Sequence, residues 1–519
     1  MRRDAPVALT VAAVAVIAAV LLPPVYLVVR AAGSPGAVAL VLAQGSTLRV
    51  VLDTALLVAT VTAATVLIGV TLAWLTTRTD VPLRRMWAVG LSLPLVLPSY
   101  VAAFAFVAAI GPRGLLRELL TPLGVQTLPD PYGFPGAWLV LTLIGYPYIY
   151  LPVRAALLSM DRSLEEAARS LGRDRWATFR GVVLPMLRPA LAAGGILVAL
   201  YTLSDFGAVS LLRFDSLTSV VFIQYKSSFD RSGAAGLALV LVGLALLVVT
   251  LERATRGGAV FYTRGGRPAD LVRLGGWRLP ALALCALVAL VALIVPLGVI
   301  SYWAVRGIGN AADVGPSVGA AVNSLSAAAL ASFAGLAAAL PVAVLVVRHG
   351  GRLAAALESA AYVGFALPGI TIALALVFFA ANFATPIYQT LALLVFAYVV
   401  RFLPEALGAC RSALLQVSPR TEEAARSLGA GAGRVFMRIT APQMIPGLAA
   451  GALLVALTTM KELPITLLLG PFGFDTLATT IWTATNEGFF ARAAVPSLGL
   501  VALSALAVAV LQREASVRE

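Results

Sequence analysis

One charged octapeptide, EEAARSLG, occurs at residues 165–172 and again, letter for letter, at 422–429. Each copy begins with two adjacent carboxylates and ends in a glycine. The helix dipole favours acids in the first turn of a helix, and a glycine just past the last turn lets the backbone reverse. We therefore expect a short surface helix in each copy, whose chemistry suits recognition of a partner better than catalysis.

The flanking residues fit the boundaries of such helices. Ser163 with Glu166 matches a capping box, in which a serine and a glutamate satisfy the first backbone N–H groups. In the second copy, Ser418 is a plausible N-cap with Pro419 at the first helical position. The first-turn acids and the terminating glycines are Glu165, Glu166, Gly172, Glu422, Glu423 and Gly429. Self-capping explains one surface helix, whereas two identical copies indicate that each contacts the same partner surface.

A second pair of carboxylates follows the octapeptides at matching distances, Asp205 after the first copy and Glu462 after the second. One interpretation is that they are interfacial acids satisfied by water or by Arg213 and Lys461. The other is that they line a path for a substrate, together with Tyr201 one turn before Asp205. Carboxylate and phenol oxygens suit hard cations, but release must follow, so we expect no tight metal site.

Residues for catalysis are scarce. The two lysines, Lys226 and Lys461, do not follow glycine, so the chain has no phosphate-binding loop of the form G-x-x-x-x-G-K-[ST]. His349 is interpreted as an interfacial residue rather than a ligand. Cys285 and Cys410 are far apart and suggest neither a disulfide framework nor a metal site. We expect no cofactor and no enzyme activity in this chain alone.

The composition predicts an integral membrane protein. The chain is 60% hydrophobic and 12% charged, against about 45–50% and about 25% in soluble domains. A crossing helix needs about 20 apolar residues. The N-terminal stretch is interpreted as the first such helix rather than a signal peptide. Twelve spans are expected in an all-α fold, at 7–31, 49–76, 86–110, 136–153, 181–204, 233–251, 279–303, 322–347, 354–380, 387–403, 442–460 and 495–511.

The distribution of charge predicts the orientation. With the N-terminus in the cytoplasm, most of the 38 Lys and Arg residues fall on the inner side, as the positive-inside rule requires. Both termini are then cytoplasmic, and both octapeptides lie in inner loops. Asp205 and Glu462 fall near the outer ends of the fifth and eleventh spans. Topology accounts for the net charge of +14, so no nucleic-acid partner is expected.

The octapeptides belong to a duplication of the whole chain. Residues 53–78 match 323–348, and residues 202–212 match 459–469. We predict a first six-helix half at 1–251, a cytoplasmic linker at 252–278 and a second six-helix half at 279–519. An even number of spans makes this a parallel repeat. Two like halves indicate a pathway between them, although a duplicated bundle without a pore is an alternative.

The octapeptides and their surroundings resemble the coupling loop of importer-type ABC transporter permeases. That loop reads E-A-A, three residues, G, nine residues, I, one residue, L-P. The first copy supplies Glu166, Ala167, Ala168, Gly172, Val182, Leu184 and Pro185. The second supplies Glu423, Ala424, Ala425, Gly429, Ile439, Ala441 and Pro442. Val182 for isoleucine and Ala441 for leucine are conservative departures from the pattern.

The resemblance implies that each loop forms a coupling helix docked on an ATP-binding subunit. It implies two copies of that cytoplasmic subunit, an extracytoplasmic substrate-binding protein, and a place in the bilayer of a bacterial plasma membrane. The stretches 203–225 and 461–482 look like the fused ferric-iron branch, although fused thiamine permeases share the layout. The expected function is ferric-iron import by alternating access. The alternatives are thiamine, polyamine or phosphonate as cargo, or a secondary transporter without an ATPase.

Overall fold

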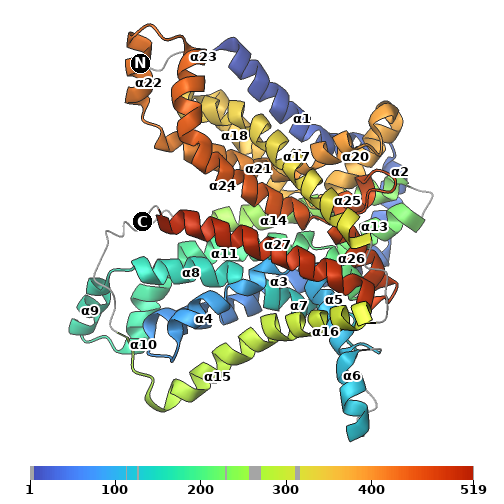
Figure 1. Ribbon diagram of the computed structural model, residues 1–519, viewed down its shortest axis with the longest axis vertical. Helices are drawn as coiled ribbons and strands as arrows, with labels where there is room; N and C mark the ends of the chain where they lie inside the picture. The colour runs from blue at the N-terminus through green and yellow to red at the C-terminus, as the bar shows by residue number, and fades with distance from the viewer. Residues whose placement is uncertain are drawn as a thin grey trace. The chain divides into compact units, whose positions relative to one another are not determined.

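The computed structural model describes residues 5–112, 114–124, 128–227, 231–255, 271–309 and 316–517. Over these residues the backbone is organised as helices, and an isolated bridge pairs Thr79 with Val272 (Figure 1). The expected all-α membrane fold is confirmed. Most of the predicted linker 252–278 lies outside the described residues.

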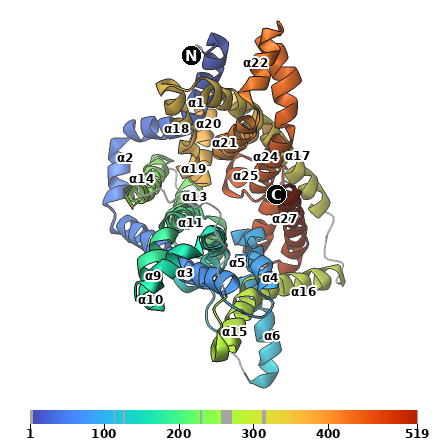
Figure 2. The same ribbon diagram turned by 90° about the vertical axis from the view of Figure 1, so that its left-hand side faces the viewer.

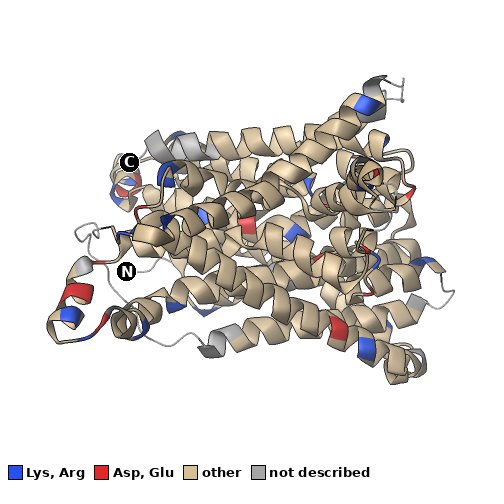
Figure 3. Ribbon diagram, turned by 90° about the horizontal axis from the view of Figure 1, so that it is seen from below, with Lys and Arg blue, Asp and Glu red and all other residues tan. Residues whose placement is uncertain are grey.

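Eleven helices of the described residues are long and apolar enough to cross a membrane. They are Val7–Ala32, Gly45–Arg78, Ser99–Glu118, Phe134–Ser159, Trp176–Ser204, Ser232–Leu251, Gly275–Gly307, Val318–His349, Leu391–Gln416, Ala432–Met460 and Phe490–Val510. The shorter apolar helix Gly369–Phe383 falls in the remaining predicted span. Charged residues are sparse along the long helices and more frequent near their ends (Figure 3).

Two of the predicted spans, 86–110 and 354–380, are wrong as continuous helices. Each is divided before a proline, between η1 and α5 in the first case and between α19 and α20 in the second. The residue before each proline is extended, with ψ 122° at Leu97 and ψ 121° at Leu367. A proline ring clashes with a helical residue before it, so the break follows from Pro98 and Pro368. The pieces are α4 (Arg84–Gly90), η1 (Leu93–Val96), α5 (Ser99–Ile110), α18 (Arg352–Ala361), α19 (Val363–Ala366) and α20 (Gly369–Phe383).

The described chain forms two compact units, and unit 2 comprises residues 43–220 and 243–306. α3, α8 and α11 pack against one another, and α12 packs on α5. α3 and α8 come close at Gly69, where a Cβ atom would lie only 2.8 Å from the Cβ of Ile149. Besides α4, η1 and α5, its elements include α3 (Gly45–Arg78), α6 (Leu115–Leu120), α7 (Phe134–Gly145), α8 (Pro147–Ser159), α9 (Arg162–Ser170), α10 (Arg175–Thr178), η3 (Phe179–Val183), α11 (Leu184–Ser204), α12 (Gly207–Leu211), α15 (Arg278–Ala289) and η5 (Leu290–Ile294), with most of α16 (Val295–Gly309).

Unit 1 comprises residues 1–42, 221–242 and 307–519. α17, α21 and α24 pack against one another as their counterparts do in unit 2, and α20 packs on α25. Besides α18, α19 and α20, its elements include α1 (Val7–Ala32), α17 (Pro316–Val344), η6 (Leu345–His349), α21 (Leu391–Gln416), α22 (Pro419–Ser427), α23 (Ala432–Val435), η8 (Phe436–Thr440), α24 (Ala441–Met460), α25 (Pro464–Leu469), α26 (Leu477–Asn486) and α27 (Phe490–Val517). α13 (Leu217–Ser227) and α14 (Arg231–Thr255) each contribute residues to both units.

The compact units do not follow the chain order of the predicted halves. α1, the first helix of the chain, packs on α17 and α20 of unit 1. The Tyr26 ring lies 5.5 Å from the Phe379 ring, and its hydroxyl donates to the Phe378 carbonyl at 3.3 Å. In unit 2, Trp303 of α16 donates its indole N–H to the Ala108 carbonyl at 3.4 Å. Unit 1 thus contains the first helix of the first predicted half, and unit 2 contains most of the first helix of the second predicted half. The duplication boundaries 1–251 and 279–519 stay a prediction.

Candidate functional site

The first octapeptide forms the helix α9, in a loop beyond the ends of α8 and α11 (Figure 1). The predicted capping box at Ser163 is wrong, because the N-cap is Asp161. Its carboxylate accepts the Ser163 backbone N–H at 3.0 Å. An aspartate with extended backbone satisfies the first N–H groups as well as a serine does, so helix α9 starts two residues earlier than the motif suggested.

The second octapeptide forms α22, which lies beyond the ends of α21 and α24 (Figure 2). Ser418 occupies the N-cap position and Pro419 is the first residue, as predicted, although the Ser418 side chain makes no capping hydrogen bond. Both loops end alike. Gly172 and Gly429 have φ +83° and donate their N–H groups to carbonyls three residues earlier, at 2.9 Å and 3.0 Å. The next N–H in each loop reaches back five residues, which completes a Schellman motif. The predicted glycine stops are confirmed.

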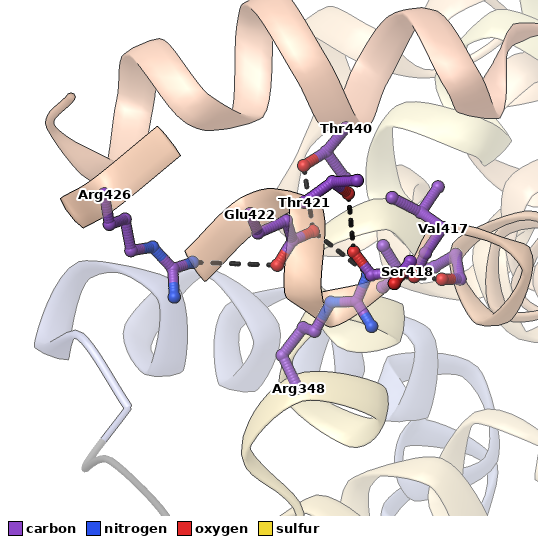
Figure 4. A network of polar contacts seen from close by, with 8 residues as sticks. Arg348, Val417, Ser418, Thr421, Glu422, Arg426 and Thr440 are labelled. Carbon is purple, nitrogen blue, oxygen red and sulfur yellow. Dashed lines mark hydrogen bonds and ion pairs between the residues drawn. The ribbon is translucent and has the colours of Figure 1, made fainter. Parts of the chain in front are cut away.

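A buried ion pair fastens the second loop to the transmembrane helices of unit 1. Glu422 Oε1 lies 3.0 Å from Arg348 Nη2, and the Thr440 hydroxyl donates to the same oxygen at 2.9 Å (Figure 4). Arg348 also donates to the carbonyls of Leu414 and Val417 at the end of α21. Carbonyls at a helix C-terminus lack partners within the helix and attract cations. Arg348 therefore joins three elements, η6, α21 and α22.

The first loop carries the matching ion pair in unit 2, without the additional hydrogen bonds of the second in the part of the chain that the structure describes. Arg78, the last residue of α3, places Nη2 3.1 Å from Glu165 Oε1, and both side chains are almost fully buried. Arg78 and Arg348 end the matched stretches 53–78 and 323–348, and Glu165 and Glu422 begin the octapeptides. The ion pair is thus repeated residue for residue. The sequence interpretation missed both arginines, although their matching places at the ends of the duplicated spans were a usable signal.

The opposite face of each loop is open. Glu166 and Glu423 are exposed, as are Ala167 and Ala424, whereas Ala168 is buried and Ala425 half-buried. Leu171 and Leu428, which occupy the same position of the two copies, are 83% and 88% exposed. Each loop therefore presents an exposed leucine beside its exposed acidic residue. In each motif the first glutamate therefore attaches the helix to the rest of its unit, and residues after it form an exposed surface.

Asp205 and Glu462 both accept hydrogen bonds from backbone N–H groups. Asp205 is buried, and its Oδ1 accepts the N–H groups of Ala208 at 2.9 Å and Val209 at 3.3 Å, at the start of α12. Glu462 Oε1 accepts the Ile465 N–H at 3.4 Å, at the start of α25. The two carboxylates occupy matching places in the two units and satisfy helix N-termini, where negative charge is stabilised.

Arg213, proposed as a partner of Asp205, and Tyr201, proposed to line the path, each contact another aromatic ring. Arg213 does not pair with Asp205; its guanidinium lies 4.6 Å from the centre of the Tyr132 ring, so that part of the interfacial interpretation is wrong. The Tyr201 ring lies 5.6 Å from that of Tyr148 on α8. Among the residues that the structure describes, no group of three His, Cys, Asp or Glu side chains could hold a metal ion.

Comparison with known proteins identifies a family with two matches in this chain. The family described as "Binding-protein-dependent transport system inner membrane component" matches residues 65–255 and again 331–514. Each matched region contains one of the two loops.

Two relatives cover most of the chain. The Fe(3+)-transport system permease protein FbpB 2 of Haemophilus influenzae is 32% identical over 469 residues, which is 89% of either chain. The ferric transport system permease protein FbpB of Actinobacillus pleuropneumoniae is 28% identical over 82% of this chain and 64% of its own.

A third relative matches a single half. The molybdenum transport system permease protein ModB of Escherichia coli K12 is 31% identical over 190 residues, or 36% of this chain and 82% of its own. A family that matches twice, each time around one anchored loop, agrees with the duplication of the units. The chain therefore belongs to the family of binding-protein-dependent transport system inner membrane components, as a multi-pass permease that carries two copies of the family's domain.

Proposed function

We propose that this permease imports ferric iron across a bacterial inner membrane, driven by ATPase subunits that bind its two loops. The observation that carries the proposal is the repeated ion pair, Arg78 with Glu165 and Arg348 with Glu422, beneath two exposed surfaces of the same sequence. Two equal surfaces suit two copies of one partner. The relatives that span most of the chain are named as ferric permeases, which supports the cargo.

The two ion pairs provide a route for force. Each joins a loop helix to the end of a long transmembrane helix, α3 in unit 2 and η6 after α17 in unit 1. Breaking a buried ion pair by removing one partner costs about 3–5 kcal/mol, because a charge is left without a partner. A displacement of α9 or α22 is therefore passed to the membrane helices rather than absorbed in the loop. Alternating access follows if the ATPases move the two loops.

The remaining partners follow from family and sequence. A protein of a binding-protein-dependent system takes its substrate from a separate protein, which we place outside the membrane. ATP hydrolysis is assigned to another subunit, since this sequence has no phosphate-binding loop. Both termini and both octapeptides are placed in the cytoplasm, on the side where the basic residues gather. Asp205, Glu462 and Tyr201 are proposed to lie beside the path, with the two carboxylates holding α12 and α25 in place.

The decisive experiment reconstitutes the permease in liposomes with its ATPase and its external binding protein. We expect ferric-loaded binding protein to stimulate ATP hydrolysis and to deliver radioactive iron to the lumen. Vesicles that lack the ATPase are the control and should take up none. Iron uptake that needs no ATPase would favour a secondary transporter. Stimulation by a thiamine-, polyamine- or phosphonate-loaded binding protein, and not by a ferric-loaded one, would contradict the cargo.

A further inference from the structure

The helix α21 carries three charged residues, of which Arg411 pairs with Glu358. The other two, Arg401 and Glu405, belong neither to the loops nor to α12 and α25. Arg401 and Glu405 are one turn apart and therefore share a face of the helix. All the remaining side chains of α21 from Ala397 to Leu407 are buried, whereas these two are partly exposed. Glu405 lies two residues past the predicted span 387–403, yet in the structure it stands close to the middle of this 26-residue apolar helix. Within this stretch of α21, the accessible side chains are thus the charged ones.

Each of the two charges has a partner of its own. The Thr458 hydroxyl of α24 donates to Glu405 Oε2 at 2.9 Å. Arg401 donates from Nη1 to the Leu367 carbonyl, at the break before Pro368. Within the described residues the two side chains form no ion pair with each other. Arg401 therefore stabilises the interrupted helix, and Glu405 keeps one carboxylate oxygen that Thr458 does not occupy.

In unit 2 the two positions that match Glu405 and Thr458 are also in contact, but both are tyrosines. By the offset of 257 residues that separates the octapeptides, Glu405 corresponds to Tyr148 and Thr458 to Tyr201. Tyr148 and Tyr201 also touch, with their rings 5.6 Å apart. Tyr148 is the one partly exposed side chain between Ile144 and Tyr150. Both units therefore leave this position accessible, and both place oxygen atoms there.

An accessible carboxylate at this depth is informative. An ionisable side chain in the middle of a span is too costly to face lipid and opens instead to water or to the protein interior. A carboxylate with a purely structural role would be buried, as Asp205 is buried against backbone N–H groups. The free oxygen of Glu405 and the hydroxyl of Thr458 are hard donors, of the kind that hard cations prefer.

We propose that Glu405, oriented by Thr458, is a cation-contacting residue of the translocation path. The inference rests on the proposed function, since it takes ferric iron as the cargo. One carboxylate and one hydroxyl form a weak site, and the positive charge of Arg401 on the same face opposes a lingering cation. The contact is therefore transient. It lowers the electrostatic barrier at mid-membrane while leaving release into the cytoplasm fast.

The test uses the complete reconstituted transporter, supplied with ferric-loaded binding protein. E405Q keeps the shape of the side chain and can still accept from Thr458, but loses the charge. We expect initial iron uptake to fall about tenfold, while stimulation of the ATPase by the binding protein stays within about twofold of wild type. E405D should retain part of the uptake. The matched control is E358Q, which removes a carboxylate of the same unit paired with Arg411 at 2.6 Å and should transport normally.

The outcomes separate the two claims. If wild type takes up no iron, the proposed cargo is wrong. If wild type takes up iron and E405Q does so within about twofold of it, Glu405 is not on the path. Should E405Q fail to assemble, T458V supplies the second test, because it leaves Glu405 unoriented. Uptake reduced about threefold or more would support the proposal, and uptake equal to wild type would overturn it.

Discussion

At the scale of single residues, the Glu422 carboxylate takes part in two ion pairs that differ in burial. Glu422 meets Arg348 at 3.0 Å in a buried setting and Arg426 at 3.7 Å near the surface. Losing the buried partner leaves a desolvated charge, which costs about 3–5 kcal/mol. An exposed pair contributes about 0–1 kcal/mol. We expect R348A to lower the melting temperature of the purified protein and open the loop to protease, whereas R426A does neither; equal behaviour of the two variants would contradict this role of the buried pair.

The exposed leucines make a separate prediction at the same scale. Leu171 and Leu428 contribute little to the fold, since each is more than four-fifths exposed. Replacing both by aspartate should leave melting temperature and membrane insertion unchanged, because no core contact is lost. It should reduce binding of the ATPase at least about tenfold, since each aspartate would lose water in the interface without gaining a partner for its charge. Pull-down with detergent-solubilised permease measures this. The matched control is L158D, on an exposed leucine of α8 before the loop; undiminished binding by the double variant would exclude the leucines from the interface.

At the scale of the element, the ends of α9 and α22 depend on backbone conformation alone. Gly172 and Gly429 have φ +83°, and an added Cβ would meet no atom within 4 Å. Substitution there is therefore a test of the left-handed conformation, which costs an ordinary residue about 1–2 kcal/mol. We expect valine at both positions to abolish transport while the protein remains in the membrane. Asparagine, which tolerates this conformation, should retain most activity. Equal transport by the two double variants would show that the helix ends do not matter for coupling.

At the scale of the whole molecule, the charge distribution predicts which loops face which side. Leu123, after α6, and Leu171, after α9, are 76% and 83% exposed and belong to loops predicted on opposite sides. In a chain whose buried Cys285 and Cys410 are replaced by alanine, L123C should react with an impermeant reagent added outside. L171C should react only from the cytoplasmic side. Labelling of both from outside would refute the orientation.

The sequence by itself determined the class of the protein, most of the spans and the two loop helices with their glycine ends. These are local properties, because apolar length and left-handed glycines act within a few positions of the chain. The duplication also lies in the sequence, because one offset of 257 residues relates the octapeptides and Asp205 with Glu462, and an offset of 270 relates Pro98 with Pro368.

The tertiary structure decided which partner each charge has. That the first glutamate of each octapeptide binds an arginine 87 or 74 residues earlier depends on packing of α3 with the first loop and of η6 with α22. Asp205 and Glu462 looked alike as candidates for a path, yet both are taken up by helix N-termini. Glu405, unremarked in the sequence, has the accessible carboxylate. Burial and distance fix these outcomes, since a charge costs free energy only where water is excluded and contributes only where a partner is in reach.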